Sequence, residues 1–143
     1  MQPSDLKQRT KRFALDVIGF TEALPKDETS RILGRQLLRS GTSVAANYRS
    51  AKRAKSNADF ISKMGIVEEE ADESGYWIEL LTEAGKVASS KSAALLQESS
   101  ELVAIAVASI NTARQGAQSN AERGTRNAES SRRPTNPARK PLT

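Results

Sequence analysis

The stretch FISKMGIVEEEADESGYWIELL, from Phe60 to Leu81, decides the fold. Its apolar and small residues are spaced alternately four and three positions apart, which places them on one face of an α-helix. We therefore predict a helix from about Asn57 to Ala84. Ser56 and Asp59 resemble a capping box at its start, with aspartate in place of the usual glutamate. The face consists of Phe60, Met64, Val67, Ala71, Ser74, Ile78 and Leu81.

A second, weaker stripe lies beside this face and comprises Ile66, Glu73, Trp77 and Leu80. It either widens the face that enters the core or forms a contact between subunits. Trp77 is the only tryptophan of the chain, and tryptophan is enriched at protein interfaces. Ile66, Trp77 and Leu80 are therefore candidate residues of an oligomer interface.

Three further segments, residues 4–24, 27–54 and 92–113, also have helical periodicity. Pro25 ends the first segment, because the residue before a proline disfavours the α region. Gly41 interrupts the second, where glycine costs about 1 kcal/mol relative to alanine, so we expect a neighbouring helix to approach closely there. The apolar faces are Leu6, Thr10, Phe13, Val17, Phe20 and Leu24; then Leu33, Leu37, Leu38, Val44, Ala45 and Tyr48; then Leu95, Leu96, Leu102, Val103, Ala106, Val107 and Ile110.

Short connections make consecutive helices antiparallel neighbours. The sequence thus predicts an all-α protein, an antiparallel up-and-down four-helix bundle over residues 1–113 with a disordered C-terminal tail over residues 114–143. The tail carries the whole net charge of +5, contains three prolines and has no aromatic residue. Such a segment buries too little apolar surface to offset its ordering entropy. As an alternative, it continues the last helix and frays after Gly116.

The composition excludes several kinds of catalytic site. The chain has 143 residues, which suits one domain, with 4% aromatic residues, no cysteine and no histidine. Without histidine there is no Ser-His-Asp triad, no His-ligated zinc and no Glu-x-x-His di-iron site. The isolated glycines match no phosphate-binding loop. We therefore predict a protein that is not an enzyme and has no cofactor or metal, and we interpret the run Glu68–Glu70 as salt-bridging.

Other features concern the compartment in which the protein works. The absence of cysteine fits a reducing environment. We find no run approaching the roughly 20 apolar residues that cross a bilayer, and the N-terminal sequence MQPSDLKQRTKRF lacks the apolar region of a signal peptide. We expect a cytoplasmic protein that has neither a membrane nor a small-molecule substrate as its partner.

The charges of the predicted bundle are strongly segregated. Residues 29–58 contain seven basic residues and no acid, whereas residues 59–83 contain eight acids and one lysine. Either the two antiparallel helices partly neutralise each other, or some of the basic residues form an exposed cationic face, and the two interpretations are compatible. Phosphate groups of nucleic acid bind such faces. The candidate nucleic-acid-binding residues are Arg49, Lys52, Arg53 and Lys55.

A line of polar residues follows the second helix, because Arg39, Ser43 and Asn47 are spaced four apart. If the turn to the third helix is centred near Ser56, Arg39 lies opposite Glu73. A half-buried polar seam of this kind would determine the helix register at some cost in stability. The alternative is that these residues simply face solvent. The predicted seam comprises Arg39, Ser43, Asn47, Glu69, Glu70 and Glu73.

The stretch from Gln36 to Leu81, which contains the Arg39, Ser43 and Asn47 pattern followed by a basic helix end and an acidic helix, resembles a known family. This is the four-helix-bundle family of the 23S rRNA intervening-sequence protein, and the resemblance covers about residues 6–112. It implies a ring-like homo-pentamer without a catalytic site and with suspected involvement with RNA. A related bundle, the accessory protein of diversity-generating retroelements, binds nucleic acid and a reverse transcriptase.

Two functions therefore compete. The first is an oligomeric protein that binds RNA through its basic surface, with the ring raising avidity. The second is a protein-interaction scaffold that does not bind nucleic acid and whose partner contacts Ile66, Trp77 and Leu80. An enzyme, the third possibility, has no catalytic constellation in its favour. Reversing the charges of Arg49 and its basic neighbours separates the first two functions.

Overall fold

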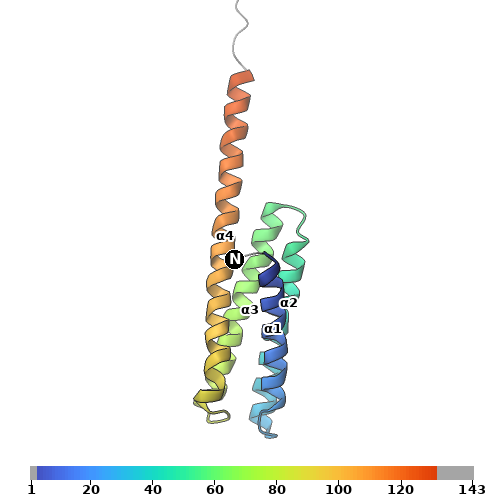
Figure 1. The fold of residues 1–143 in the computed structure, drawn as a ribbon, viewed down its shortest axis with the longest axis vertical. Helices are drawn as coiled ribbons and strands as arrows, with labels where there is room; N and C mark the ends of the chain where they lie inside the picture. The colour runs from blue at the N-terminus through green and yellow to red at the C-terminus, as the bar shows by residue number, and fades with distance from the viewer. Residues whose placement is uncertain (1–2, 132–143) are drawn as a thin grey trace, which may run out of the picture.

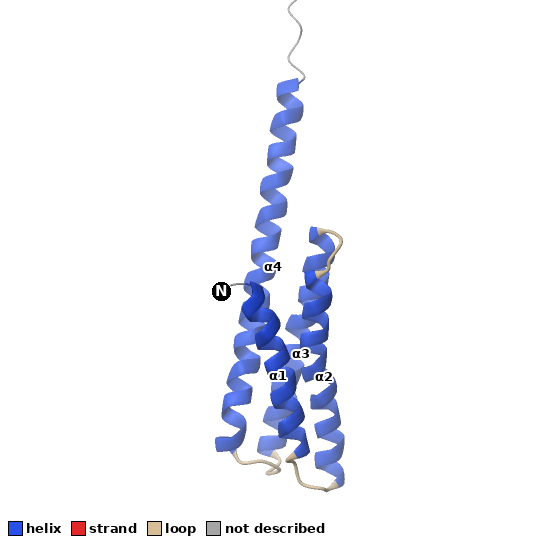
Figure 2. Ribbon diagram, turned by 45° about the vertical axis from the view of Figure 1, so that its right-hand side comes forward, coloured by secondary structure: helices blue, strands red, loops and turns tan. Residues whose placement is uncertain are grey.

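The computed structural model describes residues 3–131, which form four α-helices and no strand. They are α1 (Pro3–Glu22), α2 (Glu28–Lys52), α3 (Asn57–Glu83) and α4 (Ser89–Ser131). Consecutive helices run antiparallel and pack side by side (Figure 1; Figure 2). The predicted all-α up-and-down bundle is confirmed, and the boundaries of the first three helices lie within two residues of those expected.

The ends of α3 are held by local hydrogen bonds that the sequence encodes. At the N-cap, the side chain of Ser56 accepts a hydrogen bond from the amide of Asp59 at 3.1 Å. The carboxylate of Asp59 accepts from the amide of Lys55 at 3.1 Å, one residue before the usual partner of a capping box. At the other end, Gly85 has φ of +76°. The amide of Lys86 donates to the carbonyl of Leu81 at 3.0 Å, which completes a Schellman motif.

The core forms along the predicted apolar faces. Gly41 allows the close approach that its position predicted, because a Cβ atom there would lie 2.8 Å from both methyl groups of Val17 on α1. Ser40 and Ser74 are buried between α2 and α3, and their hydroxyls are 2.9 Å apart. The largest fully buried side chains are Phe13, Leu37, Met64, Ile78, Leu81 and Leu102.

Two residues assigned to apolar faces lie outside the core. Leu38 is 37% exposed and Val107 is 38% exposed. Ser40 and Gly41 occupy the buried surface of α2 instead, because small residues there let the neighbouring helices approach. Leu38 is therefore displaced to the rim of the α1–α2 contact.

Helix α4 differs most from the prediction, since it continues past residue 113 to Ser131. All side chains from Arg114 to Ser131 are exposed, and this segment, the α4 extension, projects beyond the turn between α2 and α3 (Figure 1). Adding a residue to an existing helix costs far less than nucleating one, and the segment contains no proline. Residues 114–131 are thus helical rather than disordered, and the rest of the predicted tail, 132–143, lies outside the described residues.

By length and composition alone, one window of α4 is apolar enough to cross a membrane. In the structure, Leu95, Leu102 and Ile110 of this helix are buried in the bundle. Glu98 and Glu101 on its flank pair with Arg9 of α1, with N–O distances of 2.5 and 2.6 Å. The helix therefore packs as an amphipathic core helix.

Candidate nucleic-acid interface

The four predicted cations gather where α2 ends and the chain turns into α3. Arg49 and Lys52 lie in the last turn of α2, Arg53 caps it, and Lys55 follows in the loop. All four side chains are exposed, and none forms an ion pair with a residue between positions 3 and 131. Cations at this place also interact favourably with the helix dipole. We call these four residues the basic end.

Asp59, the acid nearest in sequence to the basic end, has partners at the start of α3 and in the loop before it. Asp59 accepts the hydrogen bond from the amide of Lys55, and it pairs with Lys63 at 3.1 Å. These interactions, the amide bond first, hold the pKa of Asp59 below its ordinary value. The carboxylate therefore remains ionised at the start of α3, where Lys55 of the basic end also attracts it, while Arg49, Lys52 and Arg53 form no ion pair with a described residue.

No exposed aromatic ring accompanies the basic end in the described part of α2. Tyr48 is the only aromatic residue of that helix and is 3% exposed. Burial raises the pKa of its hydroxyl. Proteins that bind single-stranded nucleic acid without sequence preference stack its bases on exposed aromatic rings. Because α2 has no exposed ring, the basic end favours contacts to the phosphate backbone.

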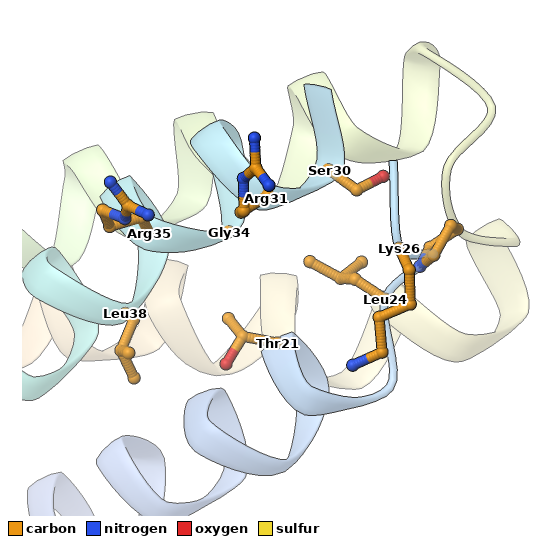
Figure 3. Close-up of a pocket in the computed structure, with 9 residues that line it drawn as sticks. Thr21, Leu24, Lys26, Ser30, Arg31, Gly34, Arg35 and Leu38 are labelled. Carbon is orange, nitrogen blue, oxygen red and sulfur yellow. The ribbon is translucent and has the colours of Figure 1, made fainter. Parts of the chain in front are cut away.

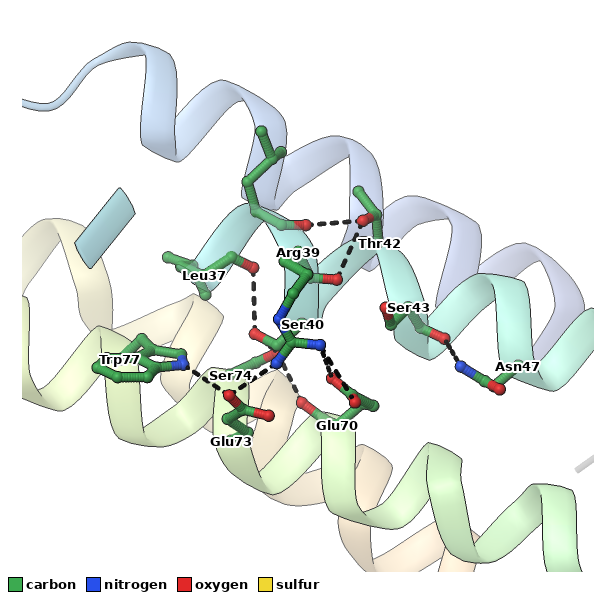
Figure 4. Close-up of polar contacts among 11 residues, drawn as sticks. Leu37, Arg39, Ser40, Thr42, Ser43, Asn47, Glu70, Glu73, Ser74 and Trp77 are labelled. Atoms are coloured by element: carbon green, nitrogen blue, oxygen red, sulfur yellow. Dashed lines mark hydrogen bonds and ion pairs between the residues drawn. The ribbon is translucent and has the colours of Figure 1, made fainter. Parts of the chain in front are cut away.

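The polar seam forms around Arg39, as Figure 4 shows. Its Nη2 atom donates to Oε1 of Glu73 at 2.7 Å, and its Nη1 atom lies 3.3 Å from Oε2 of Glu70. The indole nitrogen of Trp77 donates to the same oxygen of Glu73 at 3.2 Å. The bond from Arg39, with a smaller contribution from Trp77, lowers the pKa of Glu73 although partial burial opposes it.

The other three residues of the predicted seam do not join this network. The amide of Asn47 donates to the carbonyl of Ser43 at 2.8 Å, within α2 itself. Glu69 is exposed and forms no ion pair with a described residue, because one helical step of about 100° turns it away from α2. The structure thus brings together Arg39, Glu70 and Glu73. The participation of Trp77 was missed, although its spacing of four from Glu73 was a usable signal.

The predicted interface residues lie on the same side of α3 as the seam. Ile66 is 37% exposed, while Trp77 and Leu80 are half-buried. Ile32 of α2 is 50% exposed. The ring of Trp77 contacts that of Tyr76 edge to face, with centroids 5.0 Å apart.

The arrangement defines a four-helix bundle that carries charged and apolar surfaces over its described residues. Among residues 3–131, no three acidic side chains converge in a way that could hold a metal ion. The α3 segment adjacent to the seam is instead rich in acids that face solvent or α2.

Comparison with known proteins identifies the family. The model of the 23S rRNA-intervening sequence protein family matches residues 3–108, so the chain belongs to this family. A crystal structure of a protein of unknown function from the S23 ribosomal protein family of Bacteroides thetaiotaomicron is 32% identical, with a TM-score of 0.73. The match covers 78% of this chain and 99% of that one. No curated protein matches the sequence.

Proposed function

We propose that this protein is a non-enzymatic homo-oligomer that binds RNA through the basic end. The observation that carries the proposal is that Arg49, Lys52, Arg53 and Lys55 are exposed at one end of the bundle without an ion-pair partner among the described residues. The four positive charges of the basic end repel one another, and a bound polyanion would relieve that repulsion. The family's association with rRNA intervening sequences is consistent with an RNA ligand.

Binding of this kind is salt-sensitive and weakly sequence-selective. Each phosphate that a lysine or arginine neutralises contributes about −0.7 to −0.9 to the slope of log K against log salt. Four contacts thus predict a slope of about −3 per subunit. Because Tyr48 is buried, the bases contribute little, and affinity follows the arrangement of the phosphates.

Self-association would repeat the basic end in one particle and raise avidity. We propose that Ile66, Trp77 and Leu80 form the subunit contact, supported by the exposure of Ile66 and by the single tryptophan beside the seam. The pentameric ring that the family resemblance implies would place five basic ends around one axis. Each subunit would then add contacts at small entropic cost.

The test is binding to a structured RNA across a salt series. It uses the full chain, residues 1–113, and the full chain with Arg49, Lys52, Arg53 and Lys55 all changed to glutamate. We expect the full chain and residues 1–113 to bind with a steep salt slope and the charge-reversal variant not to bind. Binding by the full chain but not by residues 1–113 would place the activity in the segment beyond the bundle and contradict the proposal.

The alternative is a protein-interaction scaffold without nucleic-acid binding. Ile66 and Ile32, both exposed on the α2–α3 side, favour it if they stay accessible after assembly. In that case, the charge-reversal variant would keep its partner, whereas Ile66→Asp would lose it. If the full chain, residues 1–113 and the charge-reversal variant all fold, as circular dichroism verifies, and none of them binds RNA at low salt, the result would favour this alternative.

A further inference from the structure

Four arginines on the outer side of α2 form two pairs, Arg31 with Arg35 and Arg49 with Arg53. Each arginine of the second pair follows its counterpart in the first pair by eighteen positions. At 3.6 residues per turn, eighteen positions make five complete turns, so both pairs point the same way. With a rise of 1.5 Å per residue the pairs are about 27 Å apart along the helix. We call these four residues the arginine strip; its second pair belongs to the basic end.

The strip has little competing charge, because the one acid of α2 is Glu28, which stands in the first turn of the helix, three positions before Arg31. All four arginines are exposed, and none pairs with an acid in the described part of the chain. Residues 29–58 contain no acid. The positions between the two pairs on the same side of the helix are Leu38, which is 37% exposed, and Thr42 and Ala46, which are short. Arg39, which lies on the flank, is engaged by Glu70 and Glu73.

The first pair has an additional cation beside it. Arg31 and Arg35 stand at the edge of a cleft of about 370 Å³ between the end of α1 and the start of α2, which Lys26 and Thr21 also line (Figure 3). Leu24 lies in the cleft wall. This pair is therefore a second cationic cluster, at the opposite end of α2 from the turn into α3.

We infer that the arginine strip binds the backbone of double-helical RNA, with its two pairs on phosphates of successive turns. This inference rests on the proposed RNA binding and specifies its substrate class. A rigid helix holds the pairs at a constant separation, and only a duplex presents phosphates at a constant repeat. The separation of about 27 Å is shorter than the roughly 34 Å turn of B-form DNA and suits the shorter turn of the A-form duplex, which proteins recognise by shape.

A single strand is the less suitable ligand for this surface. Proteins that bind single strands stack bases on aromatic rings, and the only aromatic side chain of α2, Tyr48, is buried. The strip has arginines without rings, which is the arrangement that contacts phosphates and leaves base edges unread.

The test compares RNA hairpins with stems of about 16 base pairs, the length that one double-stranded-RNA-binding domain covers, and about 8 base pairs. The variant is the full chain with Arg31→Glu and Arg35→Glu. The control, Arg12→Glu with Lys91→Glu, makes the same change in net charge at exposed positions on α1 and α4. Circular dichroism and thermal unfolding verify that all proteins fold, and Arg31→Lys with Arg35→Lys serves as the rescue variant.

For the long stem, we expect the variant to bind about tenfold more weakly than the control, with a salt slope lower by about 2. For the short stem, which cannot reach both pairs, variant and control should bind alike. Equal losses in variant and control on the long stem would overturn the inference while leaving the proposed RNA binding intact. Equal affinity of the wild type for a single strand or a DNA duplex of the same length would also overturn it. Absence of any wild-type binding would refute both proposals.

Discussion

Arg39 shows how one side chain can connect two helices without entering the core. Its guanidinium is about half exposed, and Glu73 is one-third exposed, so the pair is partly screened by solvent and contributes modestly to stability. Glu73 also accepts from Trp77. The network therefore orients the single tryptophan as well as aligning α2 with α3, and its main contribution is to geometry.

The lowered pKa of Glu73 predicts a specific pH dependence. Because the folded state favours the ionised carboxylate, its contribution to stability is present above the unfolded-state pKa, near 4.3, and is lost as the pH falls through the lower folded-state pKa. The difference in unfolding free energy between wild type and Glu73→Gln should therefore shrink on acidification from pH 7 to pH 3.

Denaturant titrations at several pH values measure this difference. Glu69→Gln is the matched control, because it removes an exposed acid of the same helix that contacts neither Arg39 nor Trp77. Its profile should follow that of the wild type. A Glu73→Gln profile parallel to the wild type at all pH values would refute the role assigned to the network.

At the scale of the helices, small residues determine how closely neighbours approach. Gly41 lets α2 contact Val17 of α1, and Gly75 lies against Ser99 of α4, where an added Cβ would be 3.0 Å from the hydroxyl oxygen. Ser40 and Ser74 play the same part between α2 and α3. The predicted apolar periodicity identified the buried faces, whereas these close contacts depend on which residues of two helices meet.

Gly41→Ala is expected to destabilise the bundle by about 1–3 kcal/mol, the usual cost of overpacking a core. The new methyl group would lie 2.8 Å from Val17, which is fully buried and cannot move away freely. Gly65→Ala on α3 is the matched control. No atom lies within 4 Å of its added Cβ, so it should stabilise the protein by up to about 1 kcal/mol through helix propensity. Thermal or urea unfolding measures both, and a neutral Gly41→Ala would contradict the close packing.

At the scale of the whole molecule, the charges and apolar surfaces are distributed over different sides. The arginine strip follows the outside of α2, whereas Ile66 and Trp77 lie beside the seam on the α3 side. Leu15 of α1 is 53% exposed on the opposite side of its helix from the core. The proposed RNA binding and the proposed self-association therefore involve separate surfaces of the bundle.

The proposed subunit contact predicts that Ile66→Asp lowers the oligomeric state, because a charge cannot be buried in an apolar contact without a large penalty. Analytical ultracentrifugation measures the mass, and the fluorescence of Trp77, the only tryptophan, reports its local environment. Leu15→Asp is the control: it places the same charge on a more exposed apolar residue outside the contact and should leave the mass unchanged. An unchanged mass for Ile66→Asp, or an equal loss for Leu15→Asp, would rule out the assigned surface.

The sequence alone determined the number of helices, their order and most of the buried residues, because helical periodicity and capping are local properties. Ser56, Asp59 and the stripe from Phe60 to Leu81 illustrate this. The sequence also identified the basic end, because four cations within seven residues at the end of a helix are too costly to bury and therefore lie at the surface.

Only the tertiary structure decided which polar residues meet. Asn47 bonds within α2 and Glu69 faces away, while Trp77 joins Arg39 through Glu73. A shared helix face does not specify the partner on a neighbouring helix, since that partner depends on register and rotation in three dimensions. The same reason explains the position of Leu38 at the rim. For the α4 extension, the composition suggested disorder. It is helical because the packed part of α4 has already met the cost of nucleation, and each further residue adds to an existing helix.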